Sequence, residues 1–89
     1  MSSSDNVIMI GKKRVADYVL AAIILFNAGH NEVIIKGQGD NINKAVDTCN
    51  ILLSRLRDSI EIASINIDSF EHRRRLVPVL EIKLRRKMS

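Results

Sequence analysis

The strongest constraint on the fold is a helical pattern at residues 15–26 that is apolar on almost every side. Six apolar side chains follow the spacing i, i+3, i+4, i+7, i+8 and i+11: Val15, Tyr18, Val19, Ala22, Ile23 and Phe26. Most residues between them are also apolar, so little of such a helix can face water. Gly29 marks its end, because glycine readily adopts the positive φ at which helices stop.

A short apolar run lies on each side of this helix. The first, NVIMI at residues 6–10, is separated from it by GKKR, and the second, EVIIK, spans residues 32–36. Apolar runs of this length that end at a glycine are typical of buried strands. Two such strands joined by one helix predict a parallel, right-handed β-α-β unit.

A second helix is predicted after the glycine-containing segment Gly37–Gly39. We expect this segment to end the strand, and Asp40 or Asn41 to cap the helix. The apolar stripe of the helix comprises Ile42, Ala45, Val46, Cys49, Leu53 and Leu56. Cys49 is the single cysteine, so it cannot form an internal disulfide, and we interpret it as core packing rather than as a reactive thiol.

The last third of the chain has the alternation of two strands. Ile60 and Ile62 share one parity whereas Ile65 and Ile67 have the other, so we predict a bulge or strong twist near Ala63. The predicted inward positions of the final strand are Leu80, Ile82 and Leu84.

These segments predict one α/β domain, an α+β two-layer sandwich with the element order β-α-β-α-β-β. The domain should occupy residues 6–89, after a Ser-rich leader at residues 1–5 that we expect to be flexible. Strands that reach from Ile60 to Arg86 are longer than one small sheet requires, so part of the terminal hairpin should project as an arm. The longest apolar run is too short to cross a bilayer and no signal peptide is recognised, so we expect an intracellular protein with no membrane partner.

Positive charge is concentrated in residues 73–87. This segment holds seven of the fourteen Lys and Arg residues and one acidic residue, a net charge of +6, while the rest holds seven basic and nine acidic residues, a net charge of −2. A basic zone on a near-neutral body suits a polyanion such as nucleic acid. The alternative is a solvated face that only keeps the protein soluble.

Within this zone, EHRRRL at residues 71–76 places Arg73, Arg74 and Arg75 at or near the hairpin turn. The arginine head group is planar, weakly hydrated and rich in donors, which suits a narrow, negatively charged groove. An arm two strands wide could follow phosphates and insert an arginine into a minor groove. Alternatively, the triplet is a solubilising tip that prevents edge-to-edge pairing.

Two glycine-containing turns are further candidate phosphate sites. In GKKR, the side chains of Lys12, Lys13 and Arg14 precede a helix whose first amides carry partial positive charge. Ordinary surface lysines are the alternative. GQG precedes the second helix in the same way, but Asp40 would repel a phosphate there, and a tight turn explains the glycines at least as well.

Nothing in the sequence suggests catalysis, a metal or a cofactor. Neither His30 nor His72 has a serine, cysteine or paired carboxylate at a spacing that indicates a nucleophile or a general acid/base pair. A metal site would need more His, Cys or clustered acids. With two Phe, one Tyr and no Trp, the chain is also a poor candidate for stacking single-stranded bases.

Over nearly the whole chain after the leader, the sequence resembles the Alba family of archaeal chromatin proteins. The segments that carry the resemblance are NVIMIGKK (6–13), YVLAAIILFNAG (18–29), EVIIKGQG (32–39), INKAVDT (42–48) and EIKLRRK (81–87). The resemblance implies a fold like the C-terminal domain of translation initiation factor three, and a homodimer. It also implies binding of duplex DNA, often of RNA as well, with little sequence preference.

The resemblance further assigns contacts to particular residues. Lys12 and Lys13 match the lysine pair at the centre of the family's binding surface, and they are the candidates for acetylation, which would remove a charge and weaken phosphate binding. The positions that match the loop before the second helix, or lie near it, are Lys36, Gln38, Asn41 and Lys44. Many relatives carry basic residues where Gln38 and Asp40 stand, so we expect the arginine hairpin to supply a larger share of binding here.

We therefore predict a non-enzymatic, nucleoid-associated dimer of the cytoplasm that coats and compacts double-stranded DNA. Its partners would include further copies along the DNA, and an acetylase with its deacetylase. An RNA partner, including an accessory role in a ribonuclease P-type complex, is the alternative within binding proteins. A metabolic enzyme and a scaffold that binds only protein remain open alternatives.

Overall fold

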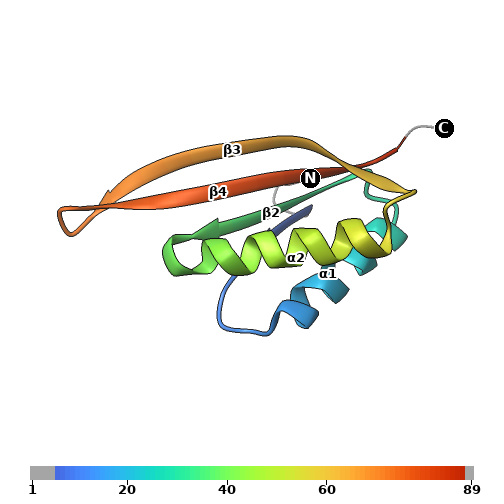
Figure 1. The fold of residues 1–89 in the computed structure, drawn as a ribbon, viewed down its shortest axis with the longest axis horizontal. Coiled ribbons are helices and arrows are strands. Elements are labelled where there is room, and N and C mark those ends of the chain that lie inside the picture. Colours follow the sequence, from blue (N-terminus) through green and yellow to red (C-terminus); the bar gives the residue numbers. More distant parts are fainter. Residues whose placement is uncertain (1–5, 88–89) are drawn as a thin grey trace.

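The computed structural model describes residues 6–87, and its elements follow the predicted order. They are strand β1 (Val7–Met9), helix α1 (Val15–Asn27), strand β2 (Glu32–Gln38), the 3-10 turn η2 (Gly39–Asn41), helix α2 (Ile42–Arg55), strand β3 (Ile60–His72) and strand β4 (Arg75–Arg86) (Figure 1). The predicted leader, residues 1–5, lies outside the described residues.

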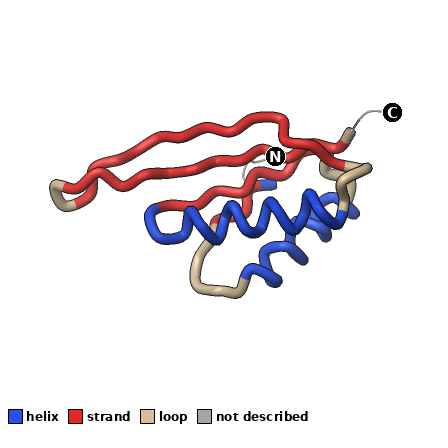
Figure 2. Tube along the Cα trace, in the orientation of Figure 1, coloured by secondary structure: helices blue, strands red, loops and turns tan. Residues whose placement is uncertain are grey.

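The four strands form one sheet in the order β1-β2-β4-β3. β1 runs parallel to β2, as a β-α-β unit requires, and β4 is antiparallel to both of its neighbours. Both helices lie on the same side of the sheet and leave its other face uncovered (Figure 2). The prediction of a two-layer fold with the order β-α-β-α-β-β is therefore confirmed.

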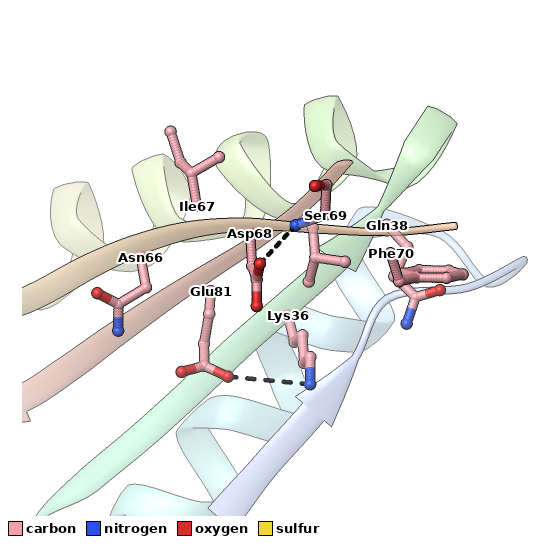
Figure 3. Close-up of a pocket in the computed structure, with 9 residues that line it drawn as sticks. Lys36, Gln38, Asn66, Ile67, Asp68, Ser69, Phe70 and Glu81 are labelled. Carbon is pink, nitrogen blue, oxygen red and sulfur yellow. Dashed lines mark hydrogen bonds and ion pairs between the residues drawn. The ribbon is translucent and has the colours of Figure 1, made fainter. Parts of the chain in front are cut away.

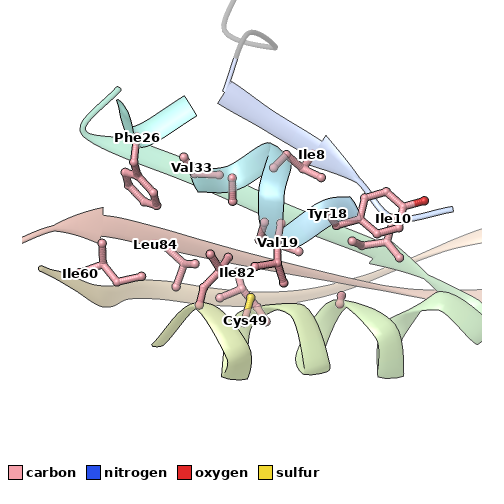
Figure 4. Close-up of a cluster of buried hydrophobic side chains, with 14 of the residues drawn as sticks. Ile8, Ile10, Tyr18, Val19, Phe26, Val33, Cys49, Ile60, Ile82 and Leu84 are labelled. Atoms are coloured by element: carbon pink, nitrogen blue, oxygen red, sulfur yellow. The ribbon is translucent and has the colours of Figure 1, made fainter. Parts of the chain in front are cut away.

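The core lies between the sheet and the two helices (Figure 4). Alternate residues of the central strands point into it, and the fully buried side chains include Val33, Ile35, Leu84, Val19 and Leu52. Full burial of an aliphatic side chain of this size contributes roughly 1.5–3 kcal/mol. The predicted inward positions of β4 are correct, since Leu80, Ile82 and Leu84 are all buried.

A bulge interrupts β3 where the isoleucine parity changes. Ile62 lies opposite Leu84 and Ser64 lies opposite Lys83, so Ala63 is the extra residue. The predicted bulge is confirmed.

Three isoleucines of β3, one before the bulge and two after it, share the helix-bearing side of the sheet but remain exposed. We call Ile62, Ile65 and Ile67 the isoleucine stripe; their side chains are 44%, 53% and 78% exposed. They face the same way as Leu84, Ile82 and Leu80, which lie opposite them in β4. Because β3 is the edge strand, the helices do not cover these side chains.

The segment Gly37–Gly39 ends β2 as predicted, but the strand runs two residues beyond the predicted range Glu32–Lys36. The strand continues to Gln38, and Gly37 is buried inside it. A Cβ added at Gly37 would lie 2.8 Å from the Asn41 carbonyl oxygen and 2.9 Å from the Ala45 Cβ, so glycine here permits the close approach of α2. The strand ends before Gly39, which has a φ of +54°.

Two further details of α2 differ from the prediction. Asn41 occupies the position before the helix, but neither it nor Asp40 makes a side-chain cap hydrogen bond, because η2 leads directly into α2. The buried face comprises Ala45, Thr48, Cys49 and Leu52, while Val46 is 36% exposed. Thr48 was not expected in the core; its hydroxyl is satisfied by donating to the Lys44 carbonyl oxygen at 2.8 Å.

The terminal hairpin projects from the body as predicted. The last pair between β2 and β4 is Gln38 with Val79, whereas β3 and β4 continue through four more pairs to His72 and Arg75. The resulting arm comprises residues 69–78, and with it the molecule measures 46 × 27 × 20 Å (Figure 1).

Candidate nucleic-acid interface

Three segments that the sequence singled out lie at the same end of the molecule. They are the loop Gly11–Arg14 between β1 and α1, the turn η2 between β2 and α2, and the arm with its tip (Figures 1 and 2). The topology explains this, because β1 and β2 are parallel and both end there, while the β3–β4 hairpin turns at the same end.

The loop Gly11–Arg14 is held from both helices. The hydroxyl of Tyr18 in α1 accepts hydrogen bonds from the amides of Gly11 at 2.7 Å and Lys13 at 3.1 Å. The ammonium of Lys44 in α2 donates to the carbonyl oxygens of Gly11 and Lys13, at 2.8 Å each. The side chains of Lys12, Lys13 and Arg14 are exposed beside this anchored backbone.

Three amides of the loop before α1 already have acceptors: those of Gly11 and Lys13 donate to Tyr18, and that of Arg14 donates to the Asp17 carboxylate at 3.2 Å. The amides at the start of α1 itself, from Val15 onward, are not involved in these contacts. Their role in holding a phosphate together with the lysines stays a prediction.

Sequence reasoning missed the role of Tyr18, which it treated only as an apolar helix position. The ring is 8% exposed and packs beside Ile10, with its oxygen at the edge of the apolar cluster (Figure 4). A usable signal was present: Tyr18 is the single tyrosine, and a buried phenol normally requires a hydrogen-bond partner.

The tip of the arm is a two-residue turn made of Arg73 and Arg74. Their φ angles are +52° and +65°, values that Asn and Gly adopt more easily than Arg. His72 and Arg75 pair directly before and after the turn, and all four side chains are exposed. The predicted arginine triplet is thus presented at the end of a paired, two-stranded arm.

Lys36 and Gln38 point to the uncovered face of the sheet (Figure 3). They line a groove of ≈ 560 Å³ together with Asn66, Asp68 and Phe70, among others. Lys36 Nζ lies 4.0 Å from Glu81 Oε2, so its charge is partly balanced within the chain. The structure therefore separates Lys36 and Gln38 from Lys44, which bonds to the Gly11–Arg14 loop.

The basic zone of residues 73–87 is continuous in sequence but divided in space. β4 places Arg75 at the arm and Arg85 and Arg86 at the opposite end of the sheet (Figure 1). Arg85 bonds to Glu61 at 2.8 Å, while Arg86 donates to the Phe26 carbonyl oxygen and lies 5.6 Å from the centre of the Phe26 ring. The prediction of one concentrated basic zone is therefore wrong.

Other kinds of site find little support in the described residues. Burial raises the pKa of Cys49 to about 12, so its thiol stays protonated at neutral pH and serves the core as predicted. Among residues 6–87, no group of three or more His, Cys, Asp or Glu side chains is placed to hold a metal ion. Over the same residues, neither helix has the length and apolar character needed to cross a bilayer.

Comparison with known protein families identifies the family to which the chain belongs. The family model described as Alba matches residues 6–69, which include the anchored loop, both helices and most of β3. The chain belongs to the Alba family. The match therefore includes the Gly11–Arg14 loop and η2, whereas the arginine turn of the arm lies beyond residue 69.

Curated Alba relatives align over most of this chain. DNA/RNA-binding protein Alba 2 of Saccharolobus solfataricus is 40% identical over 87 residues, which cover 97% of this chain and 98% of the relative. DNA/RNA-binding protein Alba of Methanocella arvoryzae is 46% identical over 67 residues, which cover 75% of this chain and 70% of the relative.

Solved Alba structures have the same architecture. Alba from Thermoplasma volcanium superposes with a TM-score of 0.80 at 34% identity, covering 91% of this chain and all of its own. ALBA1 from Trypanosoma brucei superposes with a TM-score of 0.82 at 21% identity, covering 91% of this chain and 68% of its own. The latter likeness concerns the fold alone.

Proposed function

We propose that this protein binds double-stranded DNA without reading its sequence, and that it coats and compacts the duplex as a dimer. The observation that carries the proposal is the placement of the exposed Lys12–Arg14 side chains and the arginine tip at one end of the molecule. The names of the curated relatives, DNA/RNA-binding protein Alba and Alba 2, support the same class of ligand.

In this proposal, Lys12 and Lys13 contact phosphates while the arm follows the minor groove. Lysine head groups act on phosphates as point charges, whereas the planar arginine head group can enter the narrow, electronegative groove. Such contacts position a protein on the duplex and carry no direct base readout. The proposed role is structural rather than enzymatic, in the cytoplasm and on the chromosome, and acetylation at the exposed Lys12 or Lys13 would weaken it.

The dimer is proposed to form through the isoleucine stripe. Three exposed isoleucines on one edge strand form an apolar surface of the kind that marks a protein–protein contact. A two-fold contact uses the same patch on both copies, and it would give the dimer two lysine loops and two arms for one duplex. Helix α1 also exposes apolar side chains, Leu20 at 57%, Ile24 at 56% and the small Ala16, while its remaining apolar side chains are buried or partly buried.

A salt titration of duplex affinity tests the proposal. For B-DNA, each phosphate contact contributes about 0.9 to the slope of log affinity against log salt. We expect the triple variant Arg73→Ala, Arg74→Ala, Arg75→Ala, and the double variant Lys12→Ala, Lys13→Ala, to lower this slope, the triple variant more.

The matched control is the triple variant Arg55→Ala, Arg57→Ala, Lys87→Ala, which removes the same charge from residues at or beyond the ends of α2 and β4, away from the arm tip. It should retain most of the slope. Equal losses from the arm and control variants would show that only net charge matters, and failure of the wild-type protein to bind any duplex in dilute buffer would refute the proposal.

RNA is the second candidate ligand, because the curated relatives are named for both nucleic acids. An accessory role in a ribonuclease P-type complex or in RNA stabilisation would then be the function. Competition between duplex DNA and structured RNA of equal length, at one salt concentration, decides between them. Preferential release of DNA by RNA would favour the RNA function.

A further inference from the structure

We propose that Lys44 is a positioning residue, which orders the Gly11–Arg14 loop so that Lys12 is presented to nucleic acid, rather than a phosphate contact itself. The part of this proposal that concerns nucleic-acid binding rests on the proposed function. The ordering of the loop by Lys44 is independent of that function and can be measured in the free protein.

The contacts around Lys12 carry this inference. Gly11 and Lys13, the residues directly before and after Lys12, each have both backbone polar groups bonded to side chains. The Tyr18 hydroxyl accepts from both amides, at 2.7 and 3.1 Å, and the Lys44 ammonium donates to both carbonyl oxygens, at 2.8 Å. Tyr18 belongs to α1 and Lys44 to α2, so the backbone on either side of Lys12 is bonded to both helices.

The chemistry of the Lys44 ammonium also favours this role. An ammonium has three N–H donors, and two of them are used by the loop carbonyls. Hydrogen bonds from a charged donor are the stronger kind, so a phosphate would have to compete with them. Lys12, in contrast, is exposed, and no side-chain hydrogen bond or ion pair is found for it among the described contacts.

Removal of the Lys44 anchor should therefore weaken binding through disorder of the loop. A loop that is already ordered loses little entropy on binding, whereas a released loop must be ordered by the ligand. We expect Lys44→Met to weaken duplex binding about tenfold, comparable to the loss of charged hydrogen bonds. The salt slope should stay near that of the wild type, because no phosphate contact is removed.

The first measurement is amide hydrogen exchange of Gly11 and Lys13 in the free protein. We expect exchange at these amides to be at least about tenfold faster in Lys44→Met, because their bonds to Tyr18 depend on the ordered loop. Lys87→Met is the control, since it removes an exposed lysine in the segment after β4. Unchanged exchange in Lys44→Met would overturn the proposal.

The second measurement is a double-mutant cycle of Lys44→Met with Lys12→Met, read as duplex affinity. If Lys44 acts through Lys12, its loss should have little further effect once Lys12 is absent. Two results would instead identify Lys44 as an independent phosphate contact. One is that the losses of affinity from the two single variants add up in the double variant, and the other is that Lys44→Met alone lowers the salt slope by about 0.9.

Tyr18→Phe provides a variant with no change of charge. It removes the other anchor and should reproduce both the faster exchange and the weaker binding, which keeps the proposal testable if Lys44→Met folds poorly. The two proposals can fail separately. If Lys44→Met speeds amide exchange as expected but neither the wild-type protein nor any variant binds a duplex, the proposed function is refuted, while the ordering of the loop by Lys44 is supported.

Discussion

At the scale of single residues, the two arginines of the hairpin turn show a conflict between local conformation and charge. The φ angles of Arg73 and Arg74 are both positive, a conformation that costs a non-glycine residue roughly 1 kcal/mol. Asn-Gly is the sequence that such two-residue hairpin turns favour. Arginine at both positions is understandable if the two charges are needed at the tip.

The double variant Arg73→Asn, Arg74→Gly tests this conflict. We expect the free energy of unfolding to rise by about 1–2 kcal/mol, because the strain is relieved. Duplex binding should weaken, and its salt slope should fall by about 0.9 for each lost contact. Urea denaturation and a salt titration measure the two effects.

The control for this prediction is Arg73→Lys, Arg74→Lys, which keeps both charges and the same backbone strain. Its unfolding free energy should match that of the wild type. If the Asn-Gly variant were no more stable than this control, the turn would not be strained.

At the scale of elements, β2 packs closely against the start of α2 at Gly37. A Cβ on Gly37 would lie 2.8 Å from a backbone oxygen and 2.9 Å from a helix side chain, and the backbone cannot move aside cheaply. Gly37 thus fixes the distance between the sheet and α2, and with it the position from which Lys44 reaches the loop.

Gly37→Ala should destabilise the protein by about 1–3 kcal/mol, the usual cost of overpacking. Urea denaturation at neutral pH measures this. Gly11→Ala is the matched control, because an added Cβ there would lie 3.4 Å from the Tyr18 hydroxyl, an ordinary contact. Equal destabilisation by both substitutions would show that the loss reflects glycine flexibility rather than close packing.

The elements were predictable because each depends on local periodicity. The order β-α-β-α-β-β follows from helical and alternating patterns, and the bulge at Ala63 follows from the parity of four isoleucines. The packing role of Gly37 inside β2 was not predictable in this way, because it depends on the close approach of Asn41 in η2 and Ala45 in α2.

The candidate site was predictable only where it depends on local sequence. The arginine turn and the GKKR loop could be placed from sequence because turns are local. The anchoring of that loop joins residues 33 apart, Gly11 and Lys44, and no periodicity reports such a contact. The separation of the arm arginines from Arg85, in contrast, follows from the extended final strand that the alternation of Leu80, Ile82 and Leu84 had predicted.

At the scale of the whole molecule, two exposed apolar surfaces are candidates for the contact of the proposed dimer. The isoleucine stripe lies on the edge strand β3, and Leu20 with Ile24 lies on α1. A contact through β3 would lie at the edge of the sheet beside the base of both arms, whereas a contact through α1 would lie on the exposed side of that helix. The two arrangements therefore present the arms to a duplex differently.

Ile65→Asp should convert the dimer to a monomer, because a two-fold contact would bring two buried carboxylates together. Leu20→Asp, which places the same charge on α1, should leave the dimer intact. Sedimentation equilibrium or light scattering gives the mass of each variant. Dissociation by Leu20→Asp alone would assign the contact to α1, and a monomeric wild-type protein would exclude both.

The central position of β4 has a mechanical consequence. The strand whose first residues form the arm is bonded on both sides within the sheet, and its far end is fixed by Arg85 to Glu61 and by Arg86 to Phe26. The arm is thus the free end of a strand whose remaining length is held within the sheet, and not a flexible tether. In the proposed complex, a DNA duplex pulling sideways on the tip would therefore lose its contacts with the turn arginines before the arm bent away from the sheet.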